Sequence, residues 1–66
     1  MMQIQLNGKP YSTGAATIAQ LVAELAINPR QMAIERNCEI VPRSLYDATA
    51  LSEGDVVEMV HFVGGG

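Results

Sequence analysis

Cysteine and aromatic residues are scarce in this 66-residue chain. Its one cysteine, Cys38, cannot form a disulfide within the chain, which excludes the cross-linked frameworks of many small secreted domains. Tryptophan is absent and aromatic residues make up 5% of the sequence, too few for a platform on which nucleic-acid bases stack. The first residues also lack the basic region and apolar core of a signal peptide. We therefore expect a cytoplasmic protein.

Positive charge and long apolar runs are scarce as well. Four basic residues stand against seven acidic ones, giving a net charge of -3, so the basic patch typical of nucleic-acid binding is missing. Every apolar run is far shorter than the roughly 20 residues that cross a bilayer. The sequence therefore predicts no nucleic-acid partner and no membrane partner, and its acidity would suit a protein partner with a basic docking surface.

The composition that remains is that of a folded domain. Apolar residues make up 48% of the sequence and charged residues 17%, which is typical of globular rather than disordered chains. A chain of 66 residues has room for one small domain. Because small domains bury a limited share of their surface, we expect modest stability.

The chain opens with the pattern of a β-hairpin. Apolar and polar residues alternate over 3–6, and the dipeptide Asn7-Gly8 follows. Both central positions of a type I′ turn need positive φ, which asparagine and glycine tolerate. The returning strand contains Pro10, which cannot donate a ladder hydrogen bond, so this strand should be short or lie at a sheet edge.

A single amphipathic helix is predicted next. Thr17 is a good N-cap and Gln20 stands three residues later, as in a capping box. The dipeptide Asn28-Pro29 is expected to end the helix, because the residue before proline avoids the α region. Between these signals, apolar residues recur at helical spacing and form one stripe: Ile18, Leu21, Val22 and Leu25.

The second half of the chain has the pattern of three further strands. A strand is predicted over 31–37, a tight turn at Asn37-Cys38, and a short strand that Pro42 ends. Residues 43–51 are interpreted as an irregular or short helical connection anchored by Leu45 and Leu51. A turn at 52–55 leads into a final apolar strand over 56–63.

These elements predict an α+β domain. The helix must cover an apolar sheet face, and the last strand, with the longest apolar run, suits a central position beside the first strand. The arrangement is the β-grasp, or ubiquitin-like, roll, with a mixed sheet of about five strands and one main helix. A simple meander with a packed helix stays open as an alternative.

Three glycines follow the last strand and divide the chain into a folded part, 1–63, and a flexible tail, 64–66. Glycine has no Cβ, so Gly64, Gly65 and Gly66 could enter a channel too narrow for side chains. The tail offers one chemical group, the α-carboxylate of Gly66, which we take as the candidate working group. The alternative is a frayed terminus, since chain ends are commonly disordered.

Several segments together resemble the ThiS family of sulfur carriers in thiamine biosynthesis. They are the hairpin 3–8, the turn-containing stretches 34–37 and 39–44, the turn and strand 53–58, and the terminal 63–66. The resemblance covers the whole chain. Cys38 departs from it, because the family often has glycine at this turn position.

The resemblance implies a carrier that is not an enzyme and binds no cofactor itself. A ThiF-like adenylating enzyme would use ATP and Mg²⁺ to convert the carboxylate of Gly66 into an acyl-adenylate. A sulfur donor system such as a cysteine desulfurase would then replace AMP to give a thiocarboxylate. Thiazole synthase would accept the sulfur.

The last strand offers a candidate docking face beside the tail. If Val57 and Met59 face the core, then Glu58, Val60 and Phe62 face the other way, because strand side chains alternate. Exposed apolar patches often mark partner sites, so we expect partner docking at these three residues. The alternative is that Phe62 folds over the sheet edge into the core.

The terminal glycines and the remaining polar residues also fit other interpretations. A carrier for another pathway, such as molybdopterin synthesis, would use the same terminus, whereas a ubiquitin-like interaction module would have an inert tail. Cys38 is interpreted as an incidental turn residue, since the sequence around it shows no cationic or helix-terminal setting of the kind that makes a thiol reactive. The sequence offers His61 no nucleophile to pair with, and one histidine cannot make a metal site, so it is interpreted as a structural or docking residue. Asp55 and Glu58 are assigned to solvation or docking rather than to acid–base chemistry.

Overall fold

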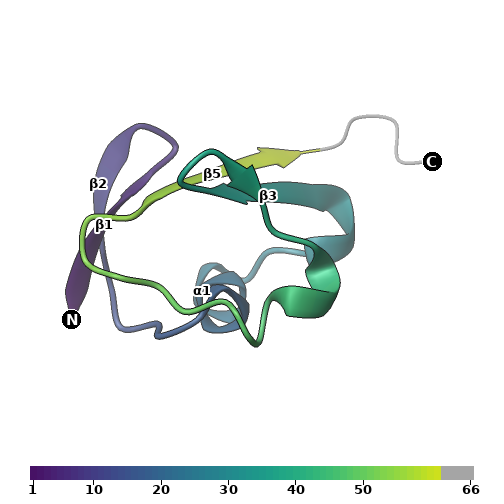
Figure 1. Ribbon diagram of the computed structural model, residues 1–66, viewed down its shortest axis with the longest axis horizontal. Coiled ribbons are helices and arrows are strands. Elements are labelled where there is room, and N and C mark those ends of the chain that lie inside the picture. Colours follow the sequence, from purple (N-terminus) through teal and green to yellow (C-terminus); the bar gives the residue numbers. More distant parts are fainter. Residues whose placement is uncertain (62–66) are drawn as a thin grey trace.

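The structure, a computed structural model, describes residues 1–61 and shows a five-stranded mixed sheet lying across one α-helix (Figure 1). The strand order is β2-β1-β5-β3-β4. The central strand β5 pairs in parallel with β1 and antiparallel with β3, so the predicted β-grasp fold is confirmed. The elements are β1 (Met2–Leu6), β2 (Lys9–Thr13), α1 (Ile18–Leu25), β3 (Met32–Arg36), β4 (Glu39–Ile40) and β5 (Val56–His61).

The opening hairpin forms as its turn residues predict. Asn7 and Gly8 have φ values of 49° and 82°, the positive angles that a type I′ turn needs. They join Leu6 to its register partner Lys9. Pro10 lies in β2, an edge strand of the sheet, where its missing N–H leaves no gap in a central ladder.

The side chains of Thr17 and Gln20 cap the start of α1. The hydroxyl of Thr17 accepts a hydrogen bond from the backbone N–H of Gln20 at 3.2 Å. The Gln20 side chain reaches back to the N–H of Ala16 at 2.7 Å, one residue before the position it would reach in a capping box. The apolar stripe faces the sheet, with Ile18 and Leu21 fully buried.

The helix ends earlier than the prediction at Asn28-Pro29. Ala26 adopts a left-handed conformation with φ of 55°, and its N–H donates to the carbonyl of Ala23 at 3.2 Å. The N–H of Ile27 donates to the carbonyl of Val22 at 3.4 Å. These two bonds form a Schellman motif, which satisfies the last carbonyls of the helix. Proline then constrains a separate 3-10 turn, η1 (Pro29–Gln31).

The connection before β5 packs through a different side chain from the one predicted. A 3-10 turn, η2 (Arg43–Leu45), leaves Leu45 48% exposed and turns the next residue, Tyr46, into the core. The carbonyl of Tyr46 accepts the N–H of Ala19 in the first turn of α1 at 3.0 Å. The expectation for Leu45 was therefore wrong, whereas the predicted burial of Leu51 is confirmed.

The core lies between α1 and one face of the sheet. Ile34, Val57 and Met59 are buried, as is Ile4 of β1, while Met2, Leu6 and Met32 are partly buried against them. Figure 1 shows α1 on one face of the sheet and no other helix of residues 1–61 over the opposite face. The buried apolar residues are Ile4, Ala15, Ile18, Leu21, Val22, Ile34, Val41, Tyr46, Leu51, Val57 and Met59.

Candidate functional site

Strand β5 carries the chain from the centre of the sheet to the last described residue, His61. Its register runs from Arg36 opposite Val57 to Met32 opposite His61. On the β1 side the register covers only Val56 and Val57, whereas β3 pairs with the strand as far as His61, so β3 sets the direction of its last residues. The chain after His61 therefore starts from a strand end that pairs with β3.

The side chains of β5 alternate as the sequence predicts. Val57 and Met59 face the core, whereas Glu58 and Val60 lie on the open face, with Val60 57% exposed. The structure thus brings two of the predicted docking residues onto one face. Phe62 and the tail residues Gly64, Gly65 and Gly66 lie outside the described residues, so their assignments remain predictions.

The open face beside Glu58 is acidic. Glu58 stands directly opposite Glu35 of β3, and Val60 stands opposite Ala33. Like charges in directly opposed positions of a sheet destabilise it. Glu35 and Glu58 place two negative charges next to the exposed apolar Val60. This arrangement suits contact with a basic and apolar partner surface.

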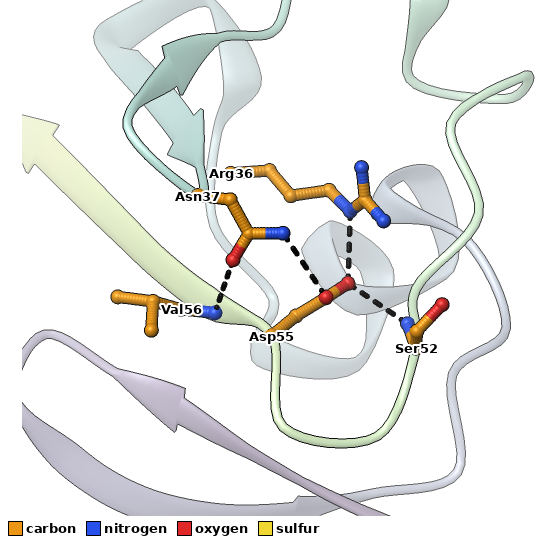
Figure 2. A network of polar contacts seen from close by, with 5 residues as sticks. All are labelled: Arg36, Asn37, Ser52, Asp55 and Val56. Carbon is orange, nitrogen blue, oxygen red and sulfur yellow. Dashed lines mark hydrogen bonds and ion pairs between the residues drawn. The ribbon is translucent and has the colours of Figure 1, made fainter.

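A polar network fixes the beginning of β5 (Figure 2). The side chain of Asp55 accepts hydrogen bonds from Arg36 Nε at 2.8 Å, from Asn37 Nδ2 at 3.1 Å and from the N–H of Ser52 at 2.8 Å. The Asn37 side chain also accepts the N–H of Val56 at 2.9 Å. The network joins the β3–β4 turn to the first residue of β5 and so sets the register of the central strand.

Asp55 is 7% exposed, which corrects its assignment to solvation or docking. Burial alone would raise its pKa, but hydrogen bonds from Ser52, Asn37 and Arg36, together with the charge of Arg36, hold the pKa below its ordinary value. Sequence reasoning missed this role because Asp55 and Arg36 are 19 residues apart. No local pattern connects a turn aspartate to a distant strand arginine.

Asn7 also has a second role that its turn position did not predict. Its side-chain oxygen accepts the N–H of Met59 at 2.7 Å, and its own N–H donates to the carbonyl of Val57 at 3.0 Å. These bonds continue the attachment of the first hairpin along β5 beyond the β1–β5 register pairs. The hairpin turn therefore helps to hold the middle of the strand that leads to the tail.

Cys38 and His61, the remaining candidate residues, lie on different elements of the structure. Cys38 is exposed in the β3–β4 turn with φ of 72°, and His61 is exposed at the end of β5. Within residues 1–61, no group of three histidine, cysteine or acidic side chains could hold a metal ion. None of the helices described there has the length and apolar character that spanning a membrane requires.

The strand order and the single covering helix define a ubiquitin-like protein of the β-grasp class. The model of the ThiS family matches residues 4–66. The chain belongs to the ThiS family. Its fold matches the crystal structure of the thiamine biosynthesis protein ThiS from Geobacter metallireducens with a TM-score of 0.85 and 35% identity, covering 98% of this chain and 100% of that one.

Two curated proteins resemble the chain in sequence. The chain is 40% identical to the sulfur carrier protein ThiS of Bacillus subtilis, covering 96% of this chain and 98% of that protein. It is 42% identical to a thiazole synthase of Paramagnetospirillum magneticum over 98% of its own length. The chain spans 20% of that thiazole synthase.

Proposed function

We propose that the chain is a sulfur carrier of thiamine biosynthesis and that its working group is the α-carboxylate of Gly66. The observation that carries the proposal is the family match over residues 4–66, which includes the three terminal glycines. The likeness to the ThiS protein of B. subtilis over nearly the whole length of both chains supports the same function. The pairing of β5 with β3 as far as His61 supports a tail that leaves from one end of the sheet.

The proposed chemistry begins at a group that is a poor electrophile. The Gly66 carboxylate attacks the α-phosphorus of ATP on a ThiF-like enzyme with Mg²⁺, pyrophosphate leaves, and an acyl-adenylate forms. The terminal sulfur of a persulfide, supplied by a cysteine desulfurase, then attacks the carbonyl carbon and AMP leaves. A thiol then attacks the donor cysteine's sulfur in the resulting acyl disulfide. The S–S bond breaks, the thiocarboxylate leaves, and a mixed disulfide forms between the thiol and the donor cysteine.

The role of the folded part in this cycle is to bind the partner enzymes. Ordering three glycines costs on the order of 1–2 kcal/mol each in backbone entropy, so contacts of the folded part must offset that loss. The open face at Glu58 and Val60 is a candidate for such contacts. In this account the carrier is a co-substrate of cytoplasmic partner enzymes and performs no catalysis itself.

Thiazole synthase is the proposed sulfur acceptor. The P. magneticum thiazole synthase contains a region similar to this chain within a longer polypeptide. Joining a carrier to its acceptor raises their effective concentration, which supports a working relationship between them. A carrier for molybdopterin synthesis would fail to deliver sulfur to thiazole synthase, and that transfer distinguishes the two pathways.

Isotope exchange between ATP and pyrophosphate tests the proposal. With the adenylating enzyme of the same organism, the chain should stimulate exchange, because reversal of the first step regenerates ATP. A chain lacking Gly66 should give no stimulation, whereas the distant variant Lys9→Gln should match the wild type. If the wild-type chain fails to stimulate the exchange, that result would favour an interaction module with an inert tail.

A further inference from the structure

Two arginines line an open hollow at the end of the sheet where β5 ends. Arg30 lies in η1 and Arg43 in η2, and the hollow between them has a volume of about 290 Å³. An adjoining hollow of about 500 Å³ shares Pro29 and both arginines. Segments 13 residues apart in sequence, from Arg30 to Arg43, thus contribute to one surface feature.

These two arginines stand out in an acidic chain. The chain has four basic residues; Lys9 lies on the β2 edge of the sheet and Arg36 pairs with the buried Asp55. Arg30 and Arg43 are exposed and take part in no ion pair among residues 1–61. No acidic residue of the described part lines either hollow, so the surface is suited to an anionic group.

Apolar side chains line the hollow beside the two arginines. Met32, Ile40, Pro42 and Tyr46 line the same hollow, and Ile40 is 67% exposed. The short strand β4 pairs with only the last two residues of β3. The hollow therefore lies along a stretch of β3 that β4 does not accompany, which suits an extended segment with both acidic and apolar side chains.

The hollow also lies close to the point where the tail begins. Met32 pairs with His61 across β3 and β5, and Arg30 precedes Met32 by two residues. Five residues follow His61, and they span at most roughly 17 Å when extended. Strand β5 ends at this end of the sheet (Figure 1). An enzyme that takes up Gly66 must therefore bring its surface close to this end.

We propose that the hollow between Arg30 and Arg43 binds an acidic, extended segment of the adenylating enzyme that takes up the tail. A carboxylate of that segment lies between the two guanidinium groups, and a neighbouring apolar side chain packs against Ile40. Arginine suits this contact because its planar donors pair with carboxylates through two parallel hydrogen bonds. The inference rests on the proposed carrier function.

Calorimetric titration with the adenylating enzyme, in the absence of nucleotide, tests the contact. The double variant R30Q/R43Q should raise Kd roughly tenfold or more, because charge-assisted hydrogen bonds across an interface are lost. Its binding should also depend less on salt concentration. Lys9→Gln removes the same type of charge from the opposite sheet edge and should leave Kd unchanged. Both arginines are exposed, so thermal unfolding should match the wild type.

The outcomes separate this inference from the proposed function. A double variant with the Kd and salt dependence of the wild type, beside a wild-type chain that is adenylated, would overturn the docking inference alone. A wild-type chain that is bound but never adenylated would overturn the proposed function alone. Absence of any binding by the wild type would overturn both.

Discussion

Arg36 Nε donates a hydrogen bond of 2.8 Å to Oδ2 of Asp55, and this contact ties the end of β3 to the residue that precedes β5. The Arg36 side chain is 31% exposed and that of Asp55 is 8% exposed. The buried member of the pair is thus the acceptor. Its other oxygen is also occupied, by the amide of Asn37.

Replacing Asp55 with asparagine should destabilise the fold. The change removes the ion pair and places an amide N–H₂ where Asp55 now accepts hydrogen bonds from several donors. We expect a loss of about 2–4 kcal/mol in the free energy of unfolding. Urea denaturation measures it, with the exposed Asp47→Asn as control. A loss no larger than that of the control would contradict the structural role of Asp55.

The same carboxylate predicts an acid-sensitive contribution to stability. Because the pKa of Asp55 is held below its ordinary value in the fold, its contribution is fully present above the pKa of the unfolded chain, about 3.9. The contribution is lost as pH falls through the lower folded pKa. Urea denaturation at a series of acidic pH values should show a smaller acid-induced loss for Asp55→Asn than for the wild type. Equal losses would contradict this assignment.

Val60→Ala separates docking from packing. Val60 is 57% exposed, so the free energy of unfolding should change by no more than about 0.5 kcal/mol, while binding to the adenylating enzyme should weaken. Met59→Ala, one residue earlier on the buried face, should instead cost about 2–5 kcal/mol in stability. Thermal unfolding and calorimetric titration measure the two effects. A large loss of stability in Val60→Ala would place that side chain in the core.

Glu58→Gln should act on stability and binding in opposite directions. Removing one of two directly opposed glutamates relieves repulsion with Glu35, and we expect a gain of about 0.2–1 kcal/mol in the free energy of unfolding. Binding to a basic partner surface should weaken at the same time. A variant that is stabilised yet binds with unchanged affinity would show that this acidic pair takes no part in docking.

Local chemistry made much of the fold predictable. Asn7-Gly8 demands a specific turn, Pro10 restricts its strand to an edge, and the spacing of Ile18 and Leu21 gives the helix one buried face. The alternation along β5 likewise placed Glu58 and Val60 correctly on the open face. Each of these features depends on residues close together in sequence.

Features that depend on distant residues were not predictable. The Asp55 network needs Arg36 and Asn37 to meet it across the sheet. The arginine hollow needs two separate 3-10 turns, η1 and η2, to converge. The early helix end at Ala26 is a local feature but was also missed, because it depends on a left-handed alanine, a conformation that costs energy for any residue with a Cβ. No periodicity in the sequence marks these positions.

Intact mass with fragmentation tests the central claim most directly. The chain is incubated with ATP, Mg²⁺, the adenylating enzyme of its organism, a cysteine desulfurase with cysteine, and a thiol. Exchange of one oxygen for sulfur adds nearly the mass of methionine oxidation, and the chain has four methionines, so fragments must locate the change. The account predicts added mass on Gly66 that depends on ATP. An unmodified Gly66, with an enzyme active on another carrier, would contradict it.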